Sequence, residues 1–309
     1  MAKYIIKRLI MSIITIWLII TLVFFLMRLM PGSPFTSERS IPPQVLANME
    51  ARFGMDKPLF EQYTMYLSGV VKGDLGPMMK KPGFTVTENI AYLFPTSAKL
   101  GGVAVLLSVT IGMVLGIIAG FNRGKFLDRL VMIIATAGIS IPSFVLASLL
   151  LLFLGLKLKL LPIMGLSSWK NYVMPAMALS GYSIAFIARI TRSRLLDVIK
   201  SDYIRTARAK GLSSIRVITG HALKNTLIPV VTYIGPLIAG ILTGSFAVEK
   251  IFAIPGLGRE FVTAISQRDY TMLLGVIIFY AIFLISINFV VDILYVVIDP
   301  RIQIDGSEA

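Results

Sequence analysis

Few residues in this 309-residue chain have the types and spacing that chemistry on a substrate requires. A phosphate-binding loop of the form G-x-x-x-x-G-K-[ST] holds phosphates and Mg²⁺ with backbone amides, a lysine and a hydroxyl. The nearest string is GFNRGKF, Gly120–Phe126, where the glycine spacing differs and Phe126 takes the place of the hydroxyl. We therefore predict that this chain does not itself hydrolyse ATP.

Other catalytic and metal-binding side chains are equally scarce. The chain has no cysteine and one histidine, His221, which excludes disulfides, thiolate metal sites and a cysteine nucleophile. The apolar segments contain no pair of acids at helical spacing. We expect no catalytic residue, no metal site and no cofactor on this chain.

A glycine-containing turn, Pro-Gly-Leu-Gly, lies within EKIFAIPGLGREFVTAISQRDY, Glu249–Tyr270. Dinucleotide-binding glycines follow a strand and open a helix, and no strand precedes this turn. Nucleotide binding is therefore not favoured here, and a plain connecting loop is an alternative to any binding role.

The composition is typical of a membrane protein. Hydrophobic residues make up 56% of the chain and charged residues only 15%, whereas a soluble protein has about a quarter charged. Six runs are long enough to cross about 30 Å of hydrocarbon as helices. We predict all-α spans near 9–29, 98–121, 129–155, 173–190, 228–248 and 272–297. The first run is longer than the core of a signal peptide and lacks a small-residue cleavage site, so we expect a retained span.

Lysine and arginine predict the orientation of the spans. The segment 189–224 carries nine basic residues against two acidic ones, whereas 31–97 balances six with six and 249–271 three with three. Because short basic loops stay inside, both termini are expected in the cytoplasm. The loop 156–172, with Lys157, Lys159 and Lys170, is an exception to this pattern.

Small residues, prolines and one acid mark positions inside the spans. Glycines four apart allow close helix approach in lipid, and they occur at Gly112, Gly116, Gly120, Gly240 and Gly244. Pro142 and Pro236 should kink their helices. Asp292 is a functional suspect by its intramembrane position, but its place near the end of a span favours snorkelling or helix pairing.

The 31–97 segment should form a small ordered subdomain. A helix is expected at about Pro43–Phe53, and apolar residues at helical spacing follow from Leu59 to Val70. Turns are expected at Gly73 and Gly76–Pro77.

A basic segment, YIRTARAKGLSSIRVITGHALKNTLIPVVT (Tyr203–Thr232), separates two spans. Its periodicity predicts a short amphipathic helix that breaks near Gly211, then a second helix. Its apolar stripe is small, built around Ala207 and Gly211, which suits docking into a partner's groove. The alternative is a basic loop that binds anionic lipid headgroups.

This segment resembles the coupling-helix (EAA-type) motif of ABC importer membrane subunits. Ala207 and Gly211 match the motif's second alanine and its glycine, while Arg205 and Thr206 stand where the general motif has glutamate and alanine. Pro229 also lies farther from Gly211 than in the general motif. Both departures resemble the peptide/nickel importer branch.

Further strings extend the resemblance over essentially the whole chain. FFLMRLMPGSPF, MDKPLFEQY, GDLG, GISIPSF, GSFAVEKIFAIPGLGREFV, RDY and DPRI occur in order. They resemble the B-type permease subunits of ABC oligopeptide importers. Dipeptide, glutathione and nickel permeases share most of these strings, and a self-sufficient secondary transporter is a more remote alternative.

The resemblance implies a six-helix ABC type I importer permease in the bacterial cytoplasmic membrane. Its expected parts are an N-terminal span (1–30), an extracytoplasmic subdomain (31–97), a core of five spans (98–300) with a coupling helix (201–215), and a cytoplasmic tail (301–309). The implied partners are a second homologous permease, two cytoplasmic ATPases that carry ATP and Mg, and an extracytoplasmic peptide-binding protein.

The resemblance also implies roles for particular residues. Coupling to the ATPase is expected at Tyr203, Arg205, Ala207, Lys210, Gly211 and Leu212. Contact with the binding protein is a hypothesis for Ile254, Pro255, Gly256, Leu257 and Gly258. On this basis Gly211→Val should abolish transport by blocking the approach of the ATPase.

Overall fold

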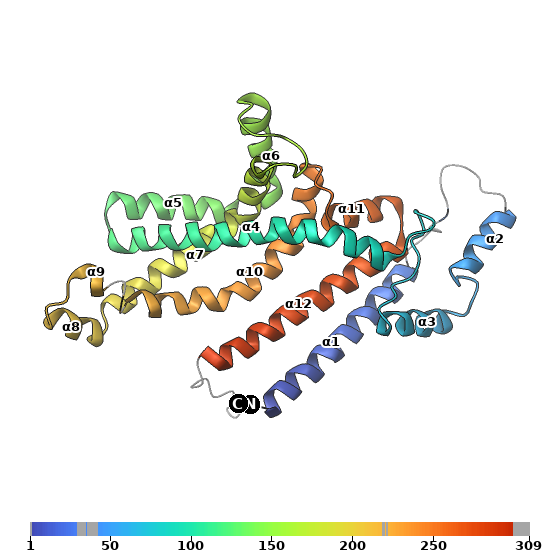
Figure 1. Ribbon diagram of the computed structural model, residues 1–309, viewed down its shortest axis with the longest axis horizontal. Coiled ribbons are helices and arrows are strands. Elements are labelled where there is room, and N and C mark those ends of the chain that lie inside the picture. Colours follow the sequence, from blue (N-terminus) through green and yellow to red (C-terminus); the bar gives the residue numbers. More distant parts are fainter. Residues whose placement is uncertain (1, 30–34, 36–42, 218–219, 221, 299–309) are drawn as a thin grey trace. The chain divides into compact units, whose positions relative to one another are not determined.

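Long apolar helices make up most of the computed structural model, which describes residues 2–29, 35, 43–217, 220 and 222–298. The chain divides into two compact units, residues 1–95 with 255–309, and residues 96–254. The first unit contains α1 (Ala2–Leu29), α2 (Pro43–Arg52), α3 (Leu59–Val71), α11 (Leu257–Gln267) and α12 (Tyr270–Ile298). The second contains α5 (Phe126–Ser140), α6 (Ser143–Leu150), the π-helix η1 (Leu151–Lys157), α7 (Trp169–Ile199), α8 (Asp202–Ala209), α9 (Ser214–Val217) and α10 (Leu223–Ile251). Helix α4 (Val86–Phe121) continues from the first unit into the second (Figure 1).

Five helices in the described residues are long and apolar enough to cross a membrane. They are Ile5–Leu29 of α1, Val86–Phe121 of α4, Trp169–Ile199 of α7, Leu223–Thr243 of α10 and Tyr270–Ile293 of α12. Each overlaps one of the predicted spans.

The third predicted span, 129–155, is not one continuous helix. It is divided into α5 and a second piece formed by α6 and η1, and the two pieces are bent by 106° at the break. Pro142 has no N–H to donate and its ring clashes with the preceding turn, and the residue before a proline avoids the α region. Ile141 accordingly has an extended backbone, with φ −92° and ψ 118°. The proline thus causes a break, where the sequence predicted only a kink.

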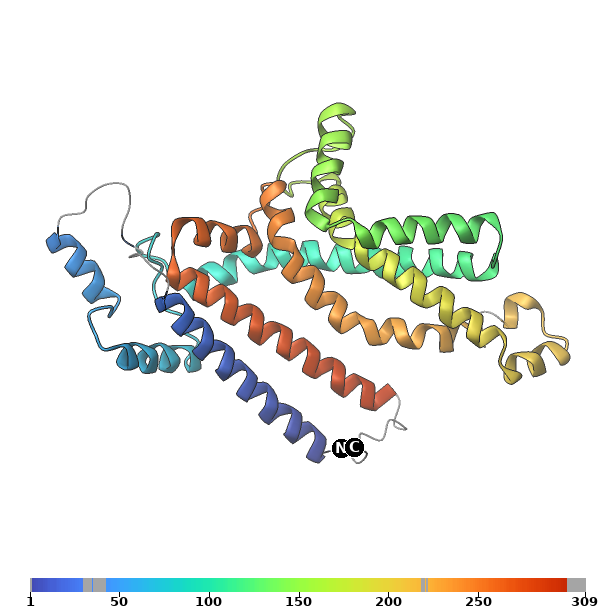
Figure 2. The same ribbon diagram turned by 180° about the vertical axis from the view of Figure 1, so that it is seen from behind.

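In the first unit, α1 and α12 lie side by side and run antiparallel (Figures 1 and 2). The guanidinium of Arg8 lies 2.6 Å from the carboxylate of Asp292, near the start of α1 and the end of α12. Asp292 therefore pairs two helices, as its position near the end of its span favoured. Helix α3 packs on α1, where the hydroxyls of Tyr63 and Thr21 lie 2.8 Å apart.

The N-terminus of α12 depends on the buried carboxylate of Asp269. Its Oδ1 accepts a hydrogen bond from the backbone N–H of Met272 at 3.0 Å, which is an N-cap contact. Its Oδ2 accepts from the backbone N–H of Lys80 at 3.1 Å. One acid therefore caps a span and fixes the loop that precedes α4, which gives the RDY string a structural role.

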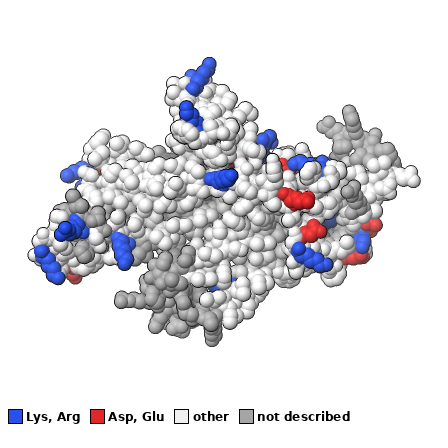
Figure 3. Space-filling model, in the orientation of Figure 1, with Lys and Arg blue, Asp and Glu red and all other residues white. Residues whose placement is uncertain are grey.

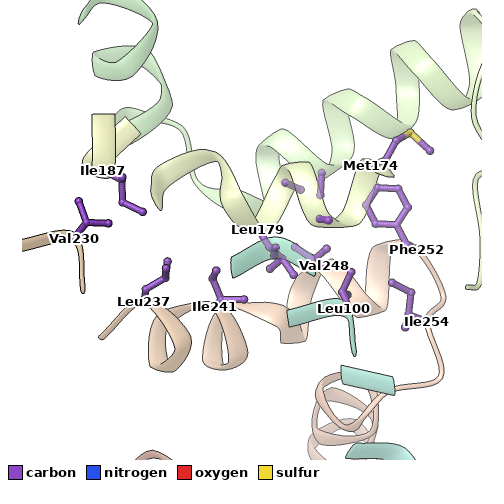
Figure 4. Close-up of a cluster of buried hydrophobic side chains, with 14 residues drawn as sticks. Leu100, Met174, Leu179, Ile187, Val230, Leu237, Ile241, Val248, Phe252 and Ile254 are labelled. Atoms are coloured by element: carbon purple, nitrogen blue, oxygen red, sulfur yellow. The ribbon is translucent and has the colours of Figure 1, made fainter. Parts of the chain in front are cut away.

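In the second unit, the core lies between α7, α10 and the part of α4 beyond residue 95. Leu179 and Ile187 of α7 face Leu237 and Ile241 of α10, and Leu100 of α4 lies beside them (Figure 4). Apart from Met174 and Phe252, the buried members of this cluster are aliphatic, so hydrocarbon packing holds these helices together.

Three of the predicted packing glycines bring α4 against α7. A Cβ atom on Gly112 would lie 2.7 Å from the Cβ of Ile187, one on Gly116 would lie 2.6 Å from the carbonyl oxygen of Ala188, and one on Gly120 would lie 2.7 Å from Leu195 Cδ2. Real Cβ contacts are longer than this, so Gly112 and Gly116, which face a Cβ and a backbone oxygen, require glycine at this separation of the helices, whereas at Gly120 the end of the Leu195 side chain would have to shift.

We predict that Gly116→Ala destabilises the protein by about 1–3 kcal/mol, because the added methyl overpacks the α4–α7 contact. The thermal midpoint of the purified protein in detergent measures the effect. Gly102→Ala on the same helix is the matched control, since a Cβ there would meet nothing within 4 Å. Equal midpoints for the two variants would contradict the proposed packing.

Candidate functional site

The predicted coupling segment forms a compact hairpin of two short helices, α8 and α9, at the end of α7 (Figure 1). Helix α8 ends in a Schellman-type cap, in which the N–H of Leu212 donates to the carbonyl of Ala207 at 3.3 Å. Gly211 lies at the left-handed position of this cap, with φ +76°. Glycine adopts this conformation without steric cost, so the chain can turn from α8 toward α9 here.

The apolar stripe of α8 faces its own chain. The side chains of Ile204 and Ala207 are 0% and 6% exposed, and they pack with Leu195 of α7, Val217 of α9 and Ala222 before α10. The side chain of Ala207, expected to meet a partner's groove, is therefore already covered by this chain, and contact with an ATPase there stays a prediction. The burial of Ile204 and Ala207 fixes the hairpin to the spans on either side.

The opposite face of α8 is polar and exposed. The side chain of Arg205 is 75% exposed and lies 3.6 Å from Asp202, and Tyr203 is 42% exposed. Lys210 and Gly211 are also exposed, and Leu212 is half-buried. Basic side chains gather over α8 and α9 (Figure 3). A partner at this surface would therefore meet cations, a phenol and the backbone at Gly211, where a Cβ would have no neighbour within 4 Å.

Polar contacts connect the hairpin to two spans. The side-chain N–H of Asn225, in the first turn of α10, donates to the Tyr203 hydroxyl at 2.8 Å. On the other side, α8 follows α7 directly and packs on Leu195. A displacement of α8 would therefore be passed to α7 and α10 together.

Helix α7 is in turn joined to α5 by a two-point ion pair. Arg192 Nε lies 2.5 Å from Asp128 Oδ1, and its Nη2 lies 2.8 Å from Oδ2. The same carboxylate accepts from the backbone N–H of Gly124, so the loop between α4 and α5 is included. The planar guanidinium fixes both distance and orientation. Arg192 thus joins α7 to α5 and, through Asp128, to the loop that precedes α5.

The residues proposed to contact a binding protein are mostly buried. Ile254 and Leu257 are fully buried, Gly256 and Gly258 are also buried, and only Pro255 is exposed. A direct contact through this segment can use Pro255 but not the side chains of Ile254 or Leu257. An experiment that replaces all of residues 254–258 would therefore disturb buried packing, and a loss of transport in it would not demonstrate a surface contact.

The glycines of α10 differ from those of α4. A Cβ on Gly240 would meet nothing within 4 Å, so the structure shows no close helix contact there. The side-chain environment at Gly244 and the 301–309 tail lie outside what the structure describes.

Two side-chain contacts between helices were not predicted from the sequence. Asn225 was present in the quoted HALKN string, but its partner Tyr203 lies more than 20 positions away, and no local periodicity connects them. Asp128 and Arg192 are still farther apart in sequence.

A chain of apolar spans that carries an exposed basic hairpin fixed to two of them has the architecture of a membrane permease subunit. The chain belongs to the family described as "Binding-protein-dependent transport system inner membrane component", which matches residues 112–304. The N-terminal component described for such systems matches residues 1–91. It is thus a multi-pass inner-membrane permease component, and the family predicted by the resemblance is confirmed.

Curated relatives align over nearly the whole chain. The chain is 47% identical over 304 residues to the dipeptide transport system permease protein DppB of Bacillus subtilis, covering 98% of this chain and 99% of the relative. It is 46% identical over 305 residues to the oligopeptide transport system permease protein OppB of Salmonella typhimurium, covering 98% and 100%.

Solved structures show the same fold at low sequence identity. The MetNI methionine ABC transporter in an inward-facing form matches with a TM-score of 0.57 and 20% identity, over 68% of this chain and 96% of that chain. An amino acid ABC transporter crystallised with histidines matches with a TM-score of 0.55 and 16% identity, over 67% and 93%. The predicted fold class, an ABC importer permease, is confirmed.

We predict that Gly211→Asn retains most transport, whereas Gly211→Val loses it. Asparagine adopts the left-handed conformation more readily than other non-glycine residues, and a β-branched residue does not. Uptake in membrane vesicles, normalised to the amount of inserted protein, measures the effect. If both variants fail equally, close approach of a partner rather than the helix cap explains the glycine.

Proposed function

We propose that this chain is the membrane-spanning subunit of an ATP-driven ABC importer and forms, with a homologous permease, the pathway for oligopeptide uptake. Its family and its 46% identity to an oligopeptide permease over 98% of the chain support this function. Dipeptide uptake is the second candidate, because a relative with 47% identity is a dipeptide permease.

The proposal includes partners that supply energy and substrate. Two cytoplasmic ATPases bind ATP and Mg and hydrolyse the nucleotide, while an extracytoplasmic binding protein delivers the peptide. This chain supplies no nucleotide site, because its nearest phosphate-loop string lacks both the glycine spacing and the hydroxyl.

Both termini are proposed to lie in the cytoplasm, together with α8 and α9. The Arg8–Asp292 ion pair supports this topology, because it places the start of α1 and the end of α12 at one end of the helix pair. An even number of crossings is then required, which agrees with counting the broken α5–α6 pair as one span. The excess of basic residues in 189–224 gives the direction.

The observation that carries the coupling role is the division of α8 into a buried and an exposed face. Its apolar face is fixed to the chain by Ile204 and Ala207, and its polar face, with Tyr203 and Arg205, is exposed to a partner. An ATPase that binds this face can therefore move α7 and α10 as its own dimer opens and closes. Such rocking of helices around a central pathway is a known class of domain movement.

We predict that Tyr203→Phe lowers peptide uptake per ATP hydrolysed, while ATPase binding persists. The variant removes the hydrogen bond to Asn225 but keeps the ring, and a neutral hydrogen bond contributes about 0.5–1.5 kcal/mol. Uptake and phosphate release are measured together in proteoliposomes that contain the complete complex. Tyr92→Phe is the matched control, because Tyr92 is 80% exposed on α4. An unchanged ratio in Tyr203→Phe would refute transmission through this contact.

The composition of the complex tests the proposed function itself. Extraction in mild detergent followed by mass spectrometry should recover a second six-span permease and two ATPases with this chain. Recovery of the chain alone, with peptide transport that requires no ATPase, would support a secondary transporter instead.

A further inference from the structure

The break between α5 and α6 lies halfway along the two apolar pieces, Phe126–Ser140 and Ser143–Lys157, so a span formed by both would place it near mid-membrane depth. Arg129 stands near the start of α5 and Ser140 at its end. The helix rise between them is about 17 Å, roughly half of a hydrocarbon core of about 30 Å. Lipid-exposed irregular backbone does not occur at such depth, and it is tolerated only where protein covers it or where it lines a water-filled cavity.

The break leaves backbone acceptors without helical partners. A helix end leaves its last carbonyls without intrahelical donors, and Pro142 supplies no N–H to the preceding turn. The N–H of Ile141 still reaches Ala137 at 3.2 Å, but the chain then turns by 106° into α6. Carbonyl groups of the last turn of α5 therefore need donors from outside the helix.

A cavity of about 350 Å³ opens at this break. Ser140 and Ser143 flank the broken turn, and α7 and α10 complete the wall with Tyr182, Ser183, Tyr233 and Gly240. Every side chain that lines this cavity in the described residues is neutral, and hydroxyl groups supply its polar side-chain atoms. Because Gly240 has open space at its Cβ position, it contributes to the open volume. We call this space the break cavity.

We propose that the break cavity contacts the peptide backbone of the substrate as it crosses the membrane. This inference rests on the proposed function and adds the residues and the chemistry of contact. The hydroxyls of Ser143 and Tyr182 can both donate and accept. The Ser140 hydroxyl donates to the carbonyl of Thr136 at 2.9 Å and can still accept, and the carbonyls of the broken turn can accept from peptide N–H groups. A neutral lining neither attracts nor repels the charges of substrate side chains, so it permits passage of peptides of varied sequence.

The absence of cysteine from these 309 residues allows a direct test of water and substrate access. In the complete complex, Ser140→Cys and Ser143→Cys should react with a membrane-impermeant cationic methanethiosulfonate reagent, and transported peptide should slow the reaction. A thiol reacts as its thiolate, which requires a hydrated site. The matched control is Ser148→Cys, exposed on α6 but outside the cavity lining. Mass spectrometry of this chain measures the labelling.

The outcomes separate this inference from the proposed function. Labelling at positions 140 and 143 that peptide slows, without labelling at 148, supports the break cavity as part of the pathway. No labelling at 140 and 143, or labelling that peptide does not change, would overturn it when the wild-type complex imports peptide. A wild-type complex that imports no peptide would overturn the proposed function as well.

A charge placed in the cavity gives a second readout. Ser140→Asp should lower the uptake of an acidic tripeptide relative to a basic one by about fivefold, the factor that corresponds to ~1 kcal/mol for unit charges 4 Å apart in water. Ser140→Asn is the uncharged control and should leave the ratio near that of the wild type. An unchanged acidic-to-basic ratio in Ser140→Asp would place the substrate path elsewhere.

Discussion

Hydrocarbon offers a peptide group no hydrogen-bond partner, and the architecture of this permease follows from that constraint. Where the backbone remains helical, each N–H and C=O finds its partner within the span. Where a described span begins or is broken, its backbone groups need hydrogen-bond partners from elsewhere. At Asp269 a buried carboxylate satisfies the first turn of α12, whereas at Ile141–Pro142 the broken turn borders a cavity lined by hydroxyl groups.

Helix α7 connects the parts that must move together. It packs against α5, α6 and α10, and the glycines of α4 approach it closely. The guanidinium of Arg192 adds a fixed polar connection to α5. The coupling hairpin follows α7 directly, so a force on α8 acts on a rigid, tightly packed element rather than on a flexible loop. Rigid packing is what permits a local displacement to become a change in the whole bundle.

Much of this organisation could be predicted from the sequence, because the signals are local. Apolar runs indicated the spans, and the glycines of α4 indicated a close helix contact before its partner was known. The helices α2 and α3 lie where the apolar spacing in 31–97 predicted them. The break at Pro142 was underestimated, since a proline alone does not reveal whether neighbouring helices support a kink or a full turn.

The site was harder to predict, because burial is a tertiary property. Ala207 belongs to a small stripe that is equally compatible with a partner's groove and with an internal contact, and only the positions of Leu195 and Ala222 decide between them. Ile254 and Leu257 lie beside an exposed proline in the sequence, yet both are buried. The Tyr203–Asn225 and Asp128–Arg192 contacts join residues from different helices, and composition carries no signal for such pairs.

The pairing of α1 with α12 has a consequence for how the protein is made. The ribosome synthesises α1 long before α12. Arg8 therefore cannot pair with Asp292 until α12 has been made. The first unit therefore closes by a contact of very high sequence separation, after the second unit has been inserted. Truncated nascent chains will contain an unpaired α1 with much of its apolar surface open to lipid or to an insertion factor.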